Sequence, residues 1–137
     1  MGAVARFGVS VEKELLAKFD RLIEKKGYAN RSEALRDLMR RALIERAWDE
    51  NAATVATVTL VYDHDDPGLE AELTEIQHHH HDNVVAAMHS HLDEHDCLQV
   101  IILRGKAKAI KHLADELIAA KGVKHGDMVM TAGGKAI

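Results

Sequence analysis

A single short strand pattern followed by two amphipathic helices is the feature that most constrains this chain. Residues 6–11 (RFGVSV) alternate polar or small with apolar side chains, the period of a half-buried strand. Residues 12–27 carry an apolar helical stripe and end in lysines and a glycine, and residues 30–43 repeat the helical spacing. One strand and two helices bury too little surface to be stable alone. We therefore expect two copies of the chain to pair these strands into an antiparallel ribbon.

Such a ribbon would present one set of side chains to DNA. Its apolar residues Phe7, Val9 and Val11 would face the helices, leaving Arg6, Gly8 and Ser10 outside. A two-stranded ribbon fits the major groove, where arginine bonds guanine and serine reaches several base edges. The second helix begins with a capping-box pattern, Asn30 as N-cap and Glu33 at the third position. Free amides at such a helix start bind phosphate, which points to Asn30, Arg31 and Ser32.

The charge distribution separates this segment from the rest of the chain. Residues 1–47 hold 11 Lys and Arg against 7 Asp and Glu, whereas residues 48–137 hold 7 against 15, together with all ten histidines. The first part therefore suits a polyanion and the second suits cations. An ordinary dimerisation unit, such as that of an antitoxin, is the alternative for residues 1–48. A polar segment at 49–53 is predicted to be a linker.

The remaining segment, residues 54–137, alternates strand and helix patterns. Strand patterns occupy residues 54–63, 83–92, 97–105 and 123–131, and helical patterns occupy residues 66–77 and 106–122. The order βαββαβ predicts a ferredoxin-like domain with helices on one face of an antiparallel sheet. The whole chain is therefore expected to be an α+β protein.

Residues 78–97 (HHHHDNVVAAMHSHLDEHDC) contain seven of the ten histidines and the only cysteine. His89 and His91 are two apart in a strand, so both side chains leave the same face roughly 6–7 Å apart. Cys97 returns on the neighbouring strand after a turn, and one histidine of residues 78–81 could complete a metal site. Zn(II) in a tetrahedral site, and Ni(II) or Cu(II) in a square-planar one, all suit such ligands.

Other interpretations of these residues are weaker. A pH sensor would use clustered histidines but has no need of the cysteine. A catalytic Cys-His pair would require a third group and an oxyanion donor, and neither is recognisable in the sequence, so we do not expect an enzyme. A sensor of small molecules, with incidental histidines, is the non-metal alternative. A single cysteine fits a reducing cytosol, and no apolar run could span a bilayer, so a cytoplasmic protein without a membrane partner is expected. Individually, the following are interpreted as solvated side chains: His64, His95, His112 and His125.

Several motifs resemble known families. The run GYANRSEALRDLMRRAL is similar to the ribbon-helix-helix DNA-binding family, and QHHHHD, HSHLDEHDC and GVKHGDM extend a resemblance to the NikR family over nearly the whole chain. That resemblance implies a ribbon-helix-helix domain fused to an ACT-type regulatory domain. It also implies a homotetramer that binds one Ni(II) per subunit and an operator of two half-sites in the major groove. The expected function is repression of nickel-uptake genes.

The resemblance also assigns residues. It makes His89, His91 and Cys97 nickel ligands from one subunit and His78 the ligand from the facing subunit. It places Tyr62 and His64 near the site as auxiliary contacts, and Gln99 stands where some relatives have an acidic residue. Glu33 and Asp37 match acidic positions that face the regulatory domain in DNA complexes. Gly8 replaces a hydroxyl residue of many relatives, and no role is assigned to His79, His80, His81 and His95.

Overall fold

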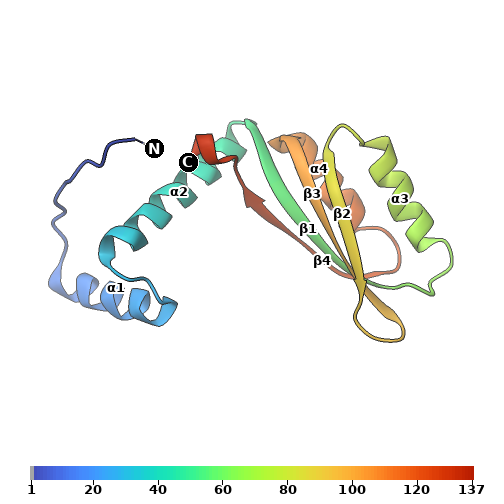
Figure 1. Cartoon of the computed structure of the whole chain (residues 1–137), viewed down its shortest axis with the longest axis horizontal. Coiled ribbons are helices and arrows are strands. Elements are labelled where there is room, and N and C mark those ends of the chain that lie inside the picture. The colour runs from blue at the N-terminus through green and yellow to red at the C-terminus, as the bar shows by residue number, and fades with distance from the viewer. Residues whose placement is uncertain (1) are drawn as a thin grey trace. The chain divides into compact units, whose positions relative to one another are not determined.

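The computed structural model describes residues 2–137, which form two compact units, one ending at Arg40 and one spanning Arg41–Ile137 (Figure 1). Helix α1 (Lys13–Lys26) lies in the first unit, and α2 (Arg31–Asp49) continues from the first into the second. Gly27, with φ 82°, ends α1 in a left-handed conformation, and its amide donates to the Glu24 carbonyl at 3.0 Å. Glycine adopts this conformation without a steric cost, so the chain turns sharply into α2.

Residues 2–12 form neither helix nor strand, so the strand predicted for residues 6–11 is absent from the single chain. Figure 1 shows this segment as an open coil before α1. The physical reason is that the amides and carbonyls of a single strand have no hydrogen-bond partners. From the sequence we expected a second copy of the chain to supply these partners. Phe7 and Val9 are 65% and 61% exposed, so neither packs on the helices of its own chain.

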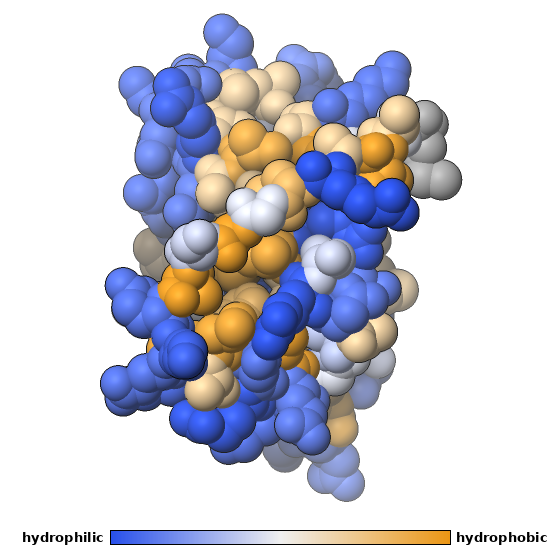
Figure 2. All heavy atoms as spheres, turned by 90° about the vertical axis from the view of Figure 1, so that its left-hand side faces the viewer, coloured by the Kyte–Doolittle hydropathy of each residue, from blue (hydrophilic) through white to orange (hydrophobic). Residues whose placement is uncertain are grey.

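The first unit leaves much of its apolar surface uncovered. Among its described residues only Ile23 and Ala34 are buried. Figure 2 shows hydrophobic side chains gathered in the middle of the face turned to the viewer, with hydrophilic ones around them. The large apolar residues exposed in this unit, besides Phe7 and Val9, are Val4, Val11, Leu15, Leu22, Leu38 and Met39.

The second unit is one antiparallel sheet with two helices. Its elements are β1 (Ala53–Asp63), α3 (Leu69–His79), β2 (Val84–His91), β3 (Asp96–Lys106), α4 (Ala107–Ile118) and β4 (Val123–Thr131), followed by a short 3-10 turn, Gly134–Ala136. The strand order is β2-β3-β1-β4, and every neighbouring pair is antiparallel. This arrangement confirms the predicted βαββαβ ferredoxin-like fold.

Both helices cover the same face of the sheet (Figure 1). On β1, alternate residues from Ala56 to Tyr62 are buried, as expected for a strand with one face against helices. Leu113 and Leu117 of α4 pack into this core, where they are wholly buried. Gly126 of β4 lies where an added Cβ would stand 2.8 Å from Ile118, so only glycine lets α4 approach this closely.

The segment predicted as a linker, residues 49–53, lies within the second unit and is hydrogen-bonded to the start of α4. The Asn51 side-chain oxygen accepts from the Lys108 amide at 2.9 Å, and the Ala52 carbonyl accepts from Ala107 at 3.0 Å. These two acceptors cap the start of α4, whose first amides have no partner within the helix. The Trp48 indole also donates to the Thr131 carbonyl at 3.0 Å. Across residues 2–137, no helix is long and apolar enough to cross a membrane.

Candidate metal centre and DNA-binding surface

Cys97 and His91 meet at the open end of the sheet. They are register partners on β3 and β2, so their side chains leave the same face, and Cys97 Sγ lies 3.3 Å from His91 Nδ1. The β2–β3 hairpin holds this register: Asp93 Oδ1 accepts from the amides of His95 and Asp96, both at 2.8 Å. A thiol and an imidazole are thereby held within reach of one ion.

Two further imidazoles stand near this pair. His64 follows the end of β1, and its ring centroid is 4.9 Å from that of His91. Donor atoms of His64, His91 and Cys97 all lie within 4.8 Å of one another. His89 is two residues before His91 on the same face, with ring centroids 6.2 Å apart. The structure thus brings two of the three predicted same-chain ligands, His91 and Cys97, together with the auxiliary His64, whereas His89 lies beside His91 but outside this cluster of donor atoms.

This donor set fits the metal that the resemblance implies. Imidazole nitrogen and thiolate sulfur are donors that bind Ni(II), Cu(II) and Zn(II), and those of His64, His91 and Cys97 converge in one chain. His78 lies in the last turn of α3 and belongs to no cluster of metal-binding groups within residues 2–137. Its own ring neighbour is His81, with centroids 6.4 Å apart.

Burial and nearby carboxylates raise the pKa of the Cys97 thiol and of the Tyr62 phenol. Cys97 is fully buried, and its burial, followed by the negative charges of Glu70 and Asp63, raises the pKa of the thiol. Tyr62 lies opposite Cys97 in the β1–β3 register, and burial beside Glu70 raises its pKa to about 12. The phenol therefore stays protonated at neutral pH, 3.4 Å from a Glu70 carboxylate oxygen that accepts its hydrogen bond. Gln99 lies opposite His89 and is half-buried.

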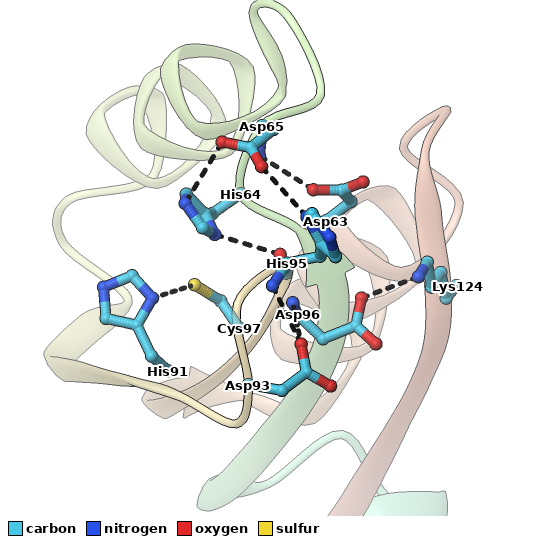
Figure 3. A network of polar contacts seen from close by, with 9 residues as sticks. All are labelled: Asp63, His64, Asp65, His91, Asp93, His95, Asp96, Cys97 and Lys124. Carbon is cyan, nitrogen blue, oxygen red and sulfur yellow. Dashed lines mark hydrogen bonds and ion pairs between the residues drawn. The ribbon is translucent and has the colours of Figure 1, made fainter.

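An acidic network joins the ends of β1 and the β2–β3 hairpin (Figure 3). The His64 amide donates to the His95 carbonyl at 2.9 Å. Asp65 spans both rings, with Oδ1 3.2 Å from His64 Nε2 and Oδ2 3.3 Å from His95 Nδ1. Lys124 Nζ donates to Asp96 Oδ1 at 2.6 Å on the far side. The sequence alone assigned no role to His95 or Asp65. These residues come together because the β1–β3 register pairs Asp63 with Asp96, and local sequence patterns do not reveal that register.

The residues predicted to contact DNA are exposed in the first unit. Arg6, Gly8 and Ser10 lie in the unpaired segment, and an added Cβ at Gly8 would meet no atom within 4 Å. At the start of α2, Asn30 Oδ1 accepts from the Glu33 amide at 2.9 Å, which confirms the predicted cap. The reciprocal half of a capping box, from the Glu33 side chain, is not among the bonds of the described residues. Among residues 2–137, neither the Arg31 nor the Ser32 amide donates a hydrogen bond.

Two of the predicted auxiliary acids have local partners in the first unit. Asp37 accepts a short hydrogen bond from the Tyr28 hydroxyl, which fastens the turn between the helices to α2. The Glu33 carboxylate lies 4.0 Å from the Arg36 guanidinium, three residues along the helix. Both side chains thus have structural contacts within their own unit.

Comparison with known proteins follows this division of the chain. Residues 5–46 match the ribbon-helix-helix family of the copG type, and residues 55–131 match the NikR C terminal nickel binding domain. A nickel-responsive regulator of Geobacter sulfurreducens is 57% identical over 100% of this chain and 99% of its own length. One of Thermococcus onnurineus is 53% identical over 98% of both chains. An uncharacterised Thermotoga maritima protein shares the fold, with a TM-score of 0.51 at 16% identity, over 57% of this chain and 96% of its own.

The fold and the matched regions define a class: a regulator with a ribbon-helix-helix DNA-binding domain and a metal-binding ferredoxin-like domain. Its relatives are named regulators, which agrees with the expectation that the chain is not an enzyme. This chain belongs to the NikR family of nickel-responsive regulators.

Proposed function

We propose that this chain is a cytoplasmic repressor that binds one Ni(II) per subunit through His89, His91 and Cys97, with His78 supplied by the facing subunit. The contact between Cys97 Sγ and His91 Nδ1, 3.3 Å long and with His89 on the same face, is the observation that carries the proposal. These four residues would hold Ni(II), and the site would be complete only where two subunits meet.

The proposed assembly is a homotetramer, two ribbon dimers joined through their regulatory domains. The uncovered apolar residues of the first unit support pairing there, because a monomer would leave them in water. The sheet face opposite the helices supports a second interface. It carries Met88 and Val129, 71% and 61% exposed, and both point away from the helical layer.

The proposed DNA contacts follow from the ribbon. In the paired form, Arg6 and Ser10 of each chain read base edges in the major groove, and Gly8 leaves its position without a side chain. Asn30, Arg31 and Ser32 hold the phosphate backbone at the start of α2. A tetramer with two ribbons binds an operator of two half-sites, which we propose controls nickel-uptake genes.

The proposed regulation is a thermodynamic coupling. The four-ligand site forms only in quaternary arrangements that bring His78 of one subunit to Cys97 of another. If those arrangements also let both ribbons reach their half-sites, metal binding raises operator affinity, and DNA raises metal affinity by the same factor.

A mobility-shift experiment tests the proposal. The full-length protein is titrated against promoter fragments of nickel-uptake genes without metal and with Ni(II), Zn(II) or Cu(II) at equal free concentration. Tighter binding with Ni(II) than with the other ions is the expected result. Binding that is equal with and without metal would reject the regulatory proposal, and a preference for Zn(II) or Cu(II) would reassign the effector.

A further inference from the structure

Asp20 of α1 holds Arg31 of α2 in a two-pronged ion pair. Arg31 Nε donates to Asp20 Oδ1 at 2.9 Å, and Nη2 donates to Oδ2 at 2.8 Å. The pair shifts both groups: the hydrogen bond and charge of Arg31 lower the pKa of Asp20, and those of Asp20 raise the pKa of Arg31. The Asp20 and Arg31 side chains are 40% and 56% exposed, so the pair lies at the protein surface.

The pair fixes where the guanidinium points without using up its donors. A guanidinium carries five N–H donors in a rigid plane. Asp20 takes two of them, and within residues 2–137 the Arg31 side chain makes no other hydrogen bond or ion pair. Three donors therefore remain, beside the backbone amides of Arg31 and Ser32, which also lack acceptors in the described chain.

We propose that Asp20 is a positioning residue for DNA binding, which holds Arg31 in the orientation that contacts a DNA phosphate. The inference rests on the proposed contact between Arg31 and the DNA backbone. A free arginine samples many rotamers, and ordering it on binding costs affinity, whereas an arginine already held by Asp20 has been ordered by folding.

The sign of the effect separates this role from plain electrostatics. Removing a carboxylate beside a polyanion strengthens association when charge alone matters. If Asp20 positions Arg31, Asp20→Asn has the opposite effect and weakens binding, although it makes the protein more positive. We expect a loss of about 2- to 10-fold per Arg31, the cost of ordering one long side chain.

The chain offers a matched control on the same helix. Glu24 lies one turn after Asp20 and lines the same shallow hollow beside the start of α2, but it makes no bond to Arg31. Glu24→Gln changes the charge by the same amount at nearly the same place. Tighter DNA binding is therefore expected for Glu24→Gln and weaker binding for Asp20→Asn.

The experiment uses the full-length protein and a duplex of arbitrary sequence at low salt, because phosphate contacts do not depend on sequence. Affinity is measured across a salt series for wild type, Asp20→Asn, Glu24→Gln, Arg31→Gln and the double variant at positions 20 and 31. Weaker binding by Asp20→Asn, lost in the Arg31→Gln background, is the result expected from positioning. Equal or tighter binding by Asp20→Asn than by wild type would overturn the inference.

Two controls keep the outcomes distinct. Thermal unfolding and Ni(II) binding are measured for each variant, and a positioning role leaves both close to wild type. If Asp20→Asn instead unfolds, then Asp20→Glu, which keeps the charge but displaces the carboxylate, takes its place and is expected to weaken binding in the same way. Failure of wild type itself to bind any duplex would reject the proposed DNA-binding function, whereas normal wild-type binding with an unaffected Asp20→Asn would reject only the positioning role.

Discussion

The thiol of Cys97 and the imidazole of His91 face each other across one register position of the β2–β3 hairpin, with 3.3 Å between Sγ and Nδ1. Because the hairpin register fixes both Cβ positions, the backbone holds these two side chains next to each other. His64 and His89 flank the pair from different segments.

The first prediction concerns which of the two flanking histidines, His64 or His89, is a ligand of the proposed metal site. Cys97→Ala is expected to abolish tight Ni(II) binding together with the thiolate-to-metal absorption band. His89→Ala is expected to do nearly as much, whereas His64→Ala is expected to retain tight binding with a loss of about 10- to 100-fold, the usual effect of an outer partner. His125, on the opposite face of the sheet, provides the control variant. Retention of tight binding by His89→Ala and its loss in His64→Ala would reverse the assignment.

The second prediction tests whether His78 acts between subunits. His78→Ala and Cys97→Ala proteins each lack one ligand of every site. After unfolding and refolding together, a mixed assembly can pair Cys97 of one chain with His78 of another. We expect absorption from the metal–thiolate bond to return in the mixture but in neither parent. His79→Ala, altered at the neighbouring position, should behave as wild type. A mixture that stays silent would place all ligands in one chain.

The third prediction concerns base recognition. Arg6→Ala should leave Ni(II) binding unchanged and cost about 1–3 kcal/mol of specific DNA affinity, the value of one good arginine–guanine contact. Gly8→Ser adds a hydroxyl into open space, so it should fold normally and change the preferred operator sequence. Selection from a random DNA library, followed by calorimetry with Ni(II), measures both effects. Equal loss of metal and DNA binding by Arg6→Ala would contradict separate modules.

The fourth prediction concerns the packing of α4 on the sheet. Gly126→Ala places a Cβ 2.8 Å from Ile118 and 3.0 Å from Leu60, and crowding of this kind typically costs about 1–3 kcal/mol. Urea unfolding should show this loss, and the loss should be smaller in an Ile118→Ala background, which lacks the two Cγ atoms nearest the added Cβ. Gly133→Ala, where an added Cβ meets no atom within 4 Å, is the neutral control. Equal stability of the Gly126 and Gly133 variants would refute the packing.

The fifth prediction follows from the pKa of Asp20, which Arg31 lowers. A carboxyl whose folded pKa is below its unfolded value of about 3.9 stabilises the fold above that pH, and this contribution is lost as the pH falls through the folded pKa. Carbon NMR should therefore give Asp20 a titration midpoint below about 3.9, which returns to it in Arg31→Gln. The difference in unfolding free energy between wild type and Arg31→Gln, small because the pair is exposed, should disappear in acid. A midpoint unmoved by the substitution would refute the ion pair in solution.

Local patterns were sufficient to predict most of the fold. The strand expected at residues 123–131 is β4 without change, and the helix predicted after Asn30 begins at Arg31, because a capping side chain marks a helix start within the sequence itself. The strand at residues 6–11 did not form in one chain, since its hydrogen-bond partners were expected from a second copy. Alternation of polar and apolar residues identifies a strand but does not show which strand it pairs with.

The candidate site was predictable only in part for a similar reason. The spacing of His89, His91 and Cys97 follows from one hairpin, so sequence alone placed them on one face of it. His64 and His95 come together because β1 pairs with β3 over eleven positions, a long-range contact that no local motif encodes. Asp20 and Arg31 belong to different helices, and their contact depends on the turn at Gly27.

The complete burial of Cys97 protects its thiol from oxidation. Thiols oxidise or cross-link when oxidants or other thiols can reach the sulfur, and sites of damage follow exposure. Here the sulfur lies beneath the sheet end, behind Tyr62 and the His91 ring. The proposed nickel site would thus keep its one thiol reduced without added reductant, and alkylating reagents should label Cys97 only after the protein unfolds.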